Sequence, residues 1–236
     1  MLNSIVGRAR RLSARMDLGM VAALLLPLPA ILPMLVNGLA PSSDSQIHLH
    51  RLVSFATHMQ HGILWPRWTP YLHLGYGYPI HLFYAPGLYF LGGLLTLAGF
   101  SPVAALVALK VLAMLLYAVG TYALARHFSP TQGALLAAAI SVYAPFRLSE
   151  AWIQGNLAQL FALALVPCTL ALLAQTARRG TPGWAASVAL AYAGLTVTHH
   201  PTAFLFSPFA GLYAMIAPWA AGRKKALRAT LGGLAL

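Results

Sequence analysis

Residues 18–40 read LGMVAALLLPLPAILPMLVNGLA and carry no charged side chain. About 20 consecutive apolar residues are enough for a helix to cross the ~30 Å hydrocarbon core of a bilayer. Residues 157–174 form another run of this kind. Strands of membrane barrels are shorter and alternate in polarity, so these runs predict an all-α polytopic membrane protein.

The composition agrees with this class. The chain has 59% hydrophobic and only 8% charged residues, whereas a soluble domain has roughly 25% charged residues. Its net charge of +12 comes from short basic clusters between apolar runs, where membrane proteins carry their orientation signals. The lipid bilayer is therefore the expected partner, and nucleic acid is not. The single cysteine, Cys168, cannot form an internal disulfide.

The basic clusters decide between two topologies. The apolar stretches are 18–40, 81–99, 103–125, 131–145, 157–175, 184–200 and 203–220, and the clusters are the arginines of residues 1–17, Arg126-His127, Arg178-Arg179 and residues 223–228. If every stretch crossed the bilayer, the last three clusters would lie outside, against the positive-inside bias. If 81–99 lies in the interface or re-enters, all four become cytoplasmic. We therefore predict about six spans and a cytoplasmic N-terminus.

This topology predicts one transmembrane domain over residues 1–236. It begins with a basic cytoplasmic lead (1–17) and an uncleaved first span (18–40), because that run is too long for a signal peptide. An outer loop with interfacial helices (41–102) and five further spans (103–228) follow. Residues 229–236 begin another apolar run, so we expect the chain to be the N-terminal portion of a longer protein.

The outer loop contains the polar stretch SSDSQIHLHRLVSFATHMQHGILWPRWTPYLHLGYGYPIHLFYAP, residues 42–86. It holds Asp44, one of three acidic residues, and six of the nine histidines. A helix from Asp44 would place Asp44, His48, Arg51, Phe55 and His58 on one face. Ser43 and Gln46 have the spacing of a capping box at its start. The stretch predicts a site at the membrane surface.

Each candidate charged residue has two interpretations. Asp44 either deprotonates a hydroxyl or holds a divalent cation, or it is a helix N-terminal acid that favours the macrodipole. Glu150 either approaches Asp44 or pairs with Arg147, three residues before it. Arg51, Arg67 and Arg147 either bind a phosphate or extend to lipid headgroups.

The remaining candidates are uncharged. His199 and His200 end an apolar stretch and point in different directions on a helix, so one of them is expected to hydrogen-bond a polar ligand. Tyr76 and Tyr78 either stack on sugar rings or belong to an interfacial aromatic belt. Lys110, inside a span, is the main reactive residue that this topology leaves away from the outer face. The chain has no glycine loop of the nucleotide-binding kinds.

Several short motifs carry a family resemblance. They are Asp44-x-x-x-His48-x-x-Arg51, Gly62-Ile-Leu-Trp-Pro-Arg-Trp68, Gly75-Tyr-Gly-Tyr-Pro79 and Phe83-Tyr-Ala-Pro86, all after one basic-led span. They resemble the bacterial integral membrane proteins called 6-pyruvoyl-tetrahydropterin synthase-related, a label that does not imply a demonstrated pterin chemistry. More distantly, the chain is similar to the C-type (GT-C fold) membrane glycosyltransferases, whose first outer loop carries an acidic motif.

The resemblance implies a GT-C-like N-terminal module in the bacterial cytoplasmic (inner) membrane. Asp44 matches the first-loop acid, which implies a base or a metal ligand. Glu150, within the segment 137–165, matches a second outer acid. Many C-type enzymes have paired acids in the first loop, whereas Ser45 and Gln46 follow Asp44 here. This lone carboxylate argues against metal dependence, and the one cofactor that the resemblance still allows is a divalent cation at Asp44.

The expected function is transfer of a sugar from a polyprenyl-phosphate-linked donor to an acceptor on the outer face, with inversion at the anomeric centre. Asp44 and Glu150 are the candidate catalytic residues, and the candidate substrate-binding residues are His48, Arg51, Arg67, Tyr76, Tyr78, Arg147, His199 and His200. The alternative is a non-enzymatic membrane transporter or an assembly protein that binds an envelope glycolipid. The same basic and aromatic outer face would serve either function.

Overall fold

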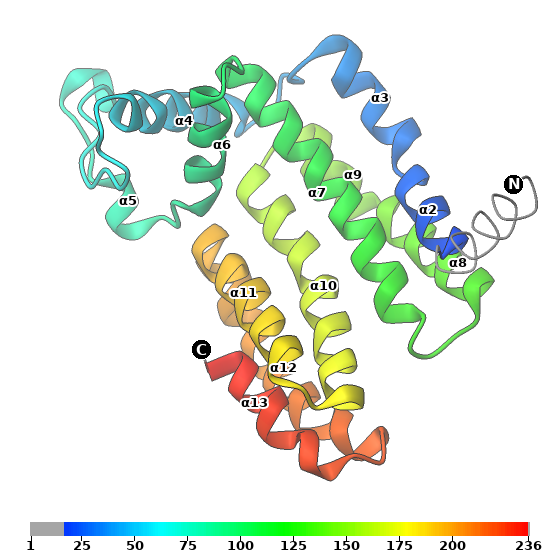
Figure 1. Ribbon diagram of the computed structural model, residues 1–236. Coiled ribbons are helices and arrows are strands. Elements are labelled where there is room, and N and C mark those ends of the chain that lie inside the picture. The colour runs from blue at the N-terminus through cyan, green and yellow to red at the C-terminus, as the bar shows by residue number, and fades with distance from the viewer. Residues whose placement is uncertain (1–16, 236) are drawn as a thin grey trace, which may run out of the picture.

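The computed structural model describes residues 17–235 and is built from helices. Figure 1 shows their arrangement in space. The helices are α2 (Leu18–Leu25), α3 (Leu28–Asn37), α4 (Ser45–Gln60), η1 (His73–Gly75), α5 (Ile80–Phe83), α6 (Gly87–Leu97), α7 (Pro102–Ala125), α8 (Thr131–Val142), α9 (Pro145–Ser149), η2 (Glu150–Gln154), α10 (Leu157–Arg179), α11 (Pro182–Thr198), α12 (His200–Ala220), η3 (Lys224–Ala226) and α13 (Leu227–Ala235). The predicted basic lead, with Arg8, Arg10, Arg11 and Arg15, lies outside the described residues apart from position 17.

Three of the described helices, α7, α10 and α12, are long and apolar enough to cross a membrane. The bent pair α2 and α3 would make a fourth span if it crosses as one unit. The predicted six spans are therefore supported only in part. α8 has 12 residues and is about 18 Å long at 1.5 Å per residue, and α11 has 17 residues. α6, with 11 residues, is also too short to cross by itself, as expected for a segment that does not span.

The helix predicted from Asp44 is α4. Its buried residues include His48, Leu52, Phe55 and Met59, spaced by three or four positions, so one face is turned toward the core. Asp44 is the N-cap, so the predicted capping box starting at Ser43 is wrong.

α2 and α3 meet at a bend of 45°. Pro27 and Pro29 lie at this bend and have no N–H, so they cannot donate to the carbonyl groups of Ala23 and Leu25. The N–H of Ala30 donates to Pro27 instead of Leu26, and the hydroxyl of Tyr143 donates to the carbonyl oxygen of Leu26 at 2.8 Å. At the beginning of α2, Asp17 accepts from the N–H of Gly19 and from the hydroxyl of Tyr122, both at 2.9 Å.

α10 lies at the centre of the fold. It contributes to one buried cluster with α4, α6 and α7, and to a second with α11, α12 and α13. Gly120 lets α7 and α10 approach closely, since a Cβ at this position would lie 2.6 Å from Sγ of Cys168. Both halves of the molecule are therefore positioned on one helix.

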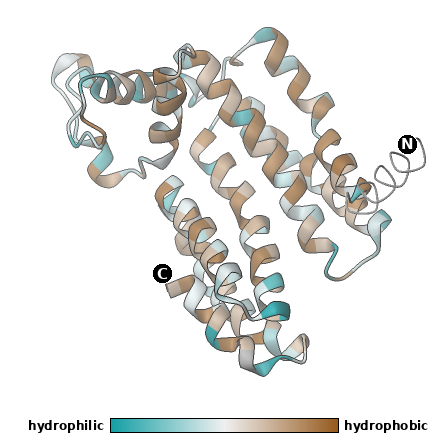
Figure 2. Cartoon of the chain, in the orientation of Figure 1, coloured by the Kyte–Doolittle hydropathy of each residue, from teal (hydrophilic) through white to brown (hydrophobic). Residues whose placement is uncertain are grey.

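The turns between the long helices form two different ends. Arg178 donates to the carbonyl oxygen of His127 at 2.8 Å, and Arg179 lines the same hollow as Arg223 and Lys224. Three of the four predicted basic clusters thus gather at one end, which we call the basic end, seen at the bottom of Figure 1; the first cluster lies outside the described residues. In Figure 2 hydrophilic residues mark the α10–α11 turn at this end, while the long helices are largely hydrophobic. The beginnings of α4, α7 and α10 lie at the opposite end.

Candidate functional site

The start of α4 is held against η2, a single π-helical turn, and such turns are frequent at functional sites. The N–H of Asp44 donates to the carbonyl oxygen of Gln154 at 2.8 Å. Gly155 ends the turn with a φ of 71°, and a Cβ there would overlap the hydroxyl oxygen of Ser42. Two segments far apart in the sequence meet in this way, which brings Asp44 beside the turn that begins with Glu150.

Glu150 and Arg147 are both buried, with 1% and 4% of their surfaces exposed. Oε2 of Glu150 and Nε and Nη1 of Arg147 have no hydrogen-bond partner in the described part of the chain. The predicted alternative, a simple pair of these two residues, does not satisfy these atoms. The guanidinium of Arg147 lies over the ring of Tyr117, 3.7 Å from its centroid. An unsatisfied buried polar group costs about 1–3 kcal/mol, so these atoms are suited to a polar ligand.

The two carboxyl groups differ in their surroundings. Burial raises the pKa of Glu150, and the charge of Asp44 adds in the same direction, whereas Arg147 opposes it. Glu150 therefore keeps its proton to a higher pH than an exposed carboxyl group. Asp44 is half-buried, and although it is the N-cap of α4 its side chain makes no capping hydrogen bond. The carboxylate of Asp44 therefore makes no hydrogen bond to the backbone N–H groups at the start of α4.

His48 and Arg51 come together on the hydroxyl of Tyr89. Nδ1 of His48 lies 2.8 Å from this oxygen, and Nη1 of Arg51 donates to it at 3.4 Å. Arg51 also lies over the ring of Tyr84, 4.6 Å from its centroid. Burial lowers the pKa of His48 to about 3, and the charges of Arg51 and Lys110 contribute. His48 is therefore a neutral hydrogen-bonding group at physiological pH, and Arg51 carries the charge.

Lys110 belongs to this region, against the expectation that it lies apart. It is buried within α7, and its Nζ donates to the carbonyl oxygen of Ala151 at 3.1 Å. Ala151 is the second residue of η2, so the lysine ties α7 to the turn that carries Glu150. A charged residue in a span is costly and needs a polar partner, which was the signal in the sequence.

His199 is brought toward the site, but His200 is not. Nδ1 of His199 accepts from the N–H of Thr202 at 3.3 Å and caps α12. Its ring lies 6.4 Å from that of Tyr84, and burial lowers the pKa of His199. His200 is exposed. The side chains of His199 and His200 therefore point in different directions, as predicted: one is buried and the other is exposed.

The aromatic loop lies to one side of these residues. A groove of about 490 Å³ separates it from α4 and is lined by Ile47, His50, Arg51, Tyr71, Leu72, His73, Leu74 and Tyr78. Of the predicted residues, Arg51 and Tyr78 line this groove. Arg67 and Tyr76 are exposed and do not. Arg51 thus connects the groove with the buried hydroxyl of Tyr89.

Sequence reasoning missed Tyr84, Tyr89 and His81. His81 is buried against the rings of Phe55 and Tyr89, at 5.0 and 5.3 Å, and both its ring nitrogens lack a partner in the described residues. Burial lowers the pKa of His81 to about 4. Aromatic and histidine residues are abundant throughout the loop, so no pattern distinguished these three.

A divalent cation at Asp44 would need further ligands beside this carboxylate. Among residues 17–235, no group of three or more His, Cys, Asp or Glu side chains is arranged to hold a metal ion. The divalent cation at Asp44 stays a prediction.

Comparison with known proteins gives one match. Residues 82–234 match the family model of the 6-pyruvoyl-tetrahydropterin synthase related domain, described as a membrane protein. No curated protein and no solved structure matches the chain. The matched region contains Lys110, Arg147 and Glu150 and begins after Asp44 and His48.

Proposed function

The chain belongs to the 6-pyruvoyl-tetrahydropterin synthase related family of membrane proteins, and from this premise we propose that it transfers a sugar from a polyprenyl-phosphate-linked donor to an acceptor on the outer face of the membrane. The observation that carries the proposal is the backbone hydrogen bond from Asp44 to Gln154. It holds an uncommitted carboxylate beside the buried groups of Glu150 and Arg147.

In the proposed reaction Asp44 accepts the proton of the acceptor hydroxyl as its oxygen bonds to the anomeric carbon. The bond from this carbon to the donor phosphate oxygen breaks, and its electron pair leaves on the lipid phosphate. A single displacement of this kind inverts the anomeric centre. Positive groups near the leaving phosphate stabilise the negative charge that develops there.

Arg51 and Arg147 are suited to that role, since a guanidinium matches phosphate geometry. His48 would contribute a neutral hydrogen bond, because burial holds its pKa at about 3. Glu150, whose pKa is raised, would hydrogen-bond a substrate oxygen through a carboxyl group that retains its proton more readily. Two carboxyl groups in unlike surroundings can take different roles in this way.

The groove beside α4 fits the sugar. Tyr71 and Tyr78 offer aromatic faces for the apolar side of a ring, and His50 and His73 offer polar atoms at the same groove. Arg51 lines the groove and also contacts Tyr89, so a sugar in the groove would keep its phosphate near the buried site.

The test compares two carboxylates in membranes that contain the full chain. Tritiated polyprenyl-phosphate-linked glucose or mannose is supplied, and radioactivity leaving the lipid-phosphate fraction is counted. Asp44→Asn should abolish transfer, whereas Asp17→Asn, at the start of α2 where Asp17 accepts from Tyr122, should leave it unchanged. Turnover by the Asp44→Asn protein at the unmodified rate would refute a base role for Asp44.

A second candidate function is non-enzymatic transport or binding of an envelope glycolipid. The observation favouring it is the burial of Lys110, Arg147 and Glu150 together in the helical bundle, since buried ionisable groups in membrane helices often mark transport pathways. It predicts thermal stabilisation by the same lipid-linked sugars without turnover, and this stabilisation would survive Asp44→Asn.

A further inference from the structure

The basic end contains a hollow that the proposed function does not use. It has a volume of about 670 Å³ and lies between the α10–α11 turn and the turn after α12. Its lining residues are Arg179, Gly180, Gly222, Arg223, Lys224 and Ala226. Gly180 and Gly222 have φ values of 64° and 66°, which let both helices end sharply at the hollow. Two turns distant in the sequence therefore form one concave surface.

The hollow is lined by three cations and by no acidic residue of the described chain. Arg179, Arg223 and Lys224 are exposed cations on its wall. Two of the three acidic residues, Asp44 and Glu150, belong to the site at the opposite end. Asp17 accepts hydrogen bonds from Tyr122 and Gly19 and takes no part in lining the hollow. An anion is the complementary ligand.

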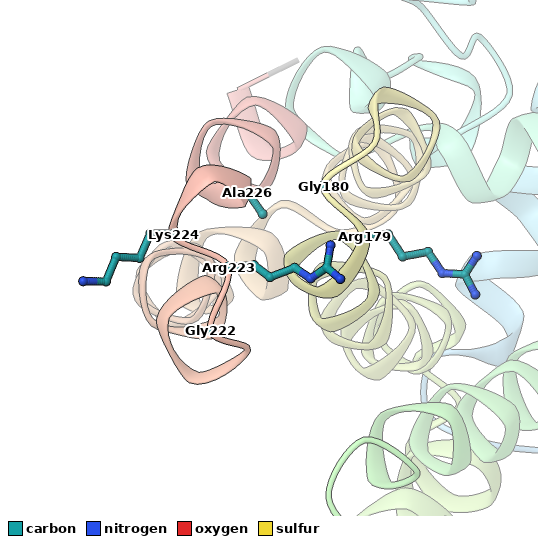
Figure 3. Close-up of a pocket in the computed structure, with 6 residues that line it drawn as sticks. All are labelled: Arg179, Gly180, Gly222, Arg223, Lys224 and Ala226. Carbon is teal, nitrogen blue, oxygen red and sulfur yellow. The ribbon is translucent and has the colours of Figure 1, made fainter.

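Figure 3 shows how the cations are arranged. Arg179 and Lys224 point to opposite sides, and the guanidinium of Arg223 lies between them. Arg223 is thus the most centrally placed of the three cations. A guanidinium is well suited to the oxygens of a phosphate.

Tryptophans place the hollow at the depth of lipid headgroups. Lys224 lies over the ring of Trp219, 4.3 Å from its centroid, and Arg179 lies 5.6 Å from that of Trp184. Trp is enriched where membrane meets water, because one part of its ring system is apolar and another is polar. Both helices that end here, α10 and α12, are long and apolar enough to span the membrane.

The surface leading away from the hollow is apolar. The last three turns of α12 expose Leu212, Met215, Ile216 and Trp219. A ligand with a phosphate in the hollow and hydrocarbon along these residues would satisfy both surfaces. A free phosphate would use only the first.

We propose that the hollow between the α10–α11 and α12–α13 turns binds an anionic phospholipid, with its phosphate at Arg223 and its acyl chains along the exposed face of α12. The site differs from a diffuse attraction of all basic residues to a charged membrane. In a diffuse attraction each exposed cation would contribute about equally. In a defined binding site, Arg223 contributes more to the binding free energy than the other exposed cations.

The experiment measures thermal stability of the full chain in neutral detergent while a lipid is titrated. The additions are phosphatidylglycerol, phosphatidylcholine and inorganic phosphate, each on the unmodified protein, Arg223→Gln and Arg126→Gln. Arg126 is an exposed cation of the same end that does not line the hollow. Both changes are at exposed positions, and the unfolding transition without added lipid reports that each variant is folded.

Phosphatidylglycerol alone should stabilise the unmodified protein. Loss of one cation near the surface corresponds to about fivefold weaker binding, so Arg223→Gln should lower the apparent affinity for phosphatidylglycerol by this factor or more, and Arg126→Gln by less than about twofold. Equal losses in the two variants would overturn the proposal in favour of diffuse attraction. Equal stabilisation by phosphatidylcholine would overturn the role of the charged headgroup. Stabilisation by inorganic phosphate would overturn the proposal of a lipid site in favour of a site for any small anion.

Discussion

The two ends of the bundle hold their charged residues in different ways. At the site end, ionisable residues are held against backbone groups of distant segments: the N–H of half-buried Asp44 donates to Gln154, and the side chain of buried Lys110 donates to Ala151. At the basic end, Arg179, Arg223 and Lys224 are exposed on turns. A buried charge depends on many neighbours, whereas an exposed charge acts nearly alone. Equivalent substitutions at the two ends should therefore have unequal effects.

The largest expected difference concerns two glycines with positive φ. Gly155→Ala combines left-handed strain with overlap against Ser42, so we expect a loss of about 3 kcal/mol in the free energy of unfolding. Gly222→Ala, with no atom within 4 Å of the added Cβ, should cost only about 1–2 kcal/mol. Chemical unfolding in detergent measures both. Equal losses would mean that the docking of α4 on η2 adds no packing constraint.

The next comparison replaces a lysine at each end by methionine. Lys110→Met removes the hydrogen bond to Ala151 and lets η2 shift, which should lower the rate of sugar transfer by about 100-fold. Lys224→Met should leave transfer unchanged. Transition temperatures of the two variants provide the control for folding. Full transfer activity in Lys110→Met would show that η2 is positioned without the lysine.

The pH dependence of stability tests the buried histidines. Because the pKa of His48 is lower in the folded chain, at about 3, than in the unfolded chain, at about 6.5, its contribution to stability is present above pH 6.5 and lost as the pH falls toward 3. By pH 5 the loss is about 2 kcal/mol. His48→Gln should flatten this decline in unfolding experiments between pH 7 and pH 5.

The matched position at the basic end is His127. Burial and the charge of Arg178 also lower the pKa of His127, but its side chain is only half-buried. His127→Gln should therefore change the pH dependence less than His48→Gln does. The reverse order would contradict the difference in burial between the two ends.

The smallest expected effect separates two arginines of the outer loop. Arg51→Gln removes the contacts with Tyr84 and Tyr89 and should lower the transfer rate by about tenfold, equivalent to 1.4 kcal/mol. Arg67→Gln, at an exposed position outside the groove, should change the rate by less than about twofold. If Arg67→Gln had the larger effect, the substrate would contact the outside of the loop instead of the groove.

Prediction from sequence was most accurate for features set by local geometry. The helix beginning after Asp44 was predicted, and of the five residues expected to share one face His48 and Phe55 are buried, whereas Asp44, Arg51 and His58 are half-buried. The number of spans was less predictable. The distribution of basic residues indicates which side of the membrane a turn lies on, but it does not give the length of the helices between the turns. The stretch 131–145 ends as a helix of only 12 residues, since Pro145 starts a new helix, α9.

The candidate site was predictable in part. Asp44, His48, Arg51, Arg147 and Glu150 were expected because polar residues are rare in such a chain. Tyr84 and Tyr89 were not, since their importance lies in contacts with Arg51 and His48. The sequence showed Lys110 as a charged residue inside an apolar stretch, where burying its charge costs free energy. Its partner is a backbone carbonyl group, and sequence patterns do not predict such a partner.

The sequence by itself determined the membrane class, the apolar helices and the basic clusters, because these depend on run length, periodicity and charge. Only the tertiary structure decided that the start of α4 meets η2, that Lys110 joins them and that the α10–α11 and α12–α13 turns enclose a hollow. Each of these features needs close contact between segments far apart in the chain. Such contacts depend on how the helices pack around α10, which no local pattern specifies.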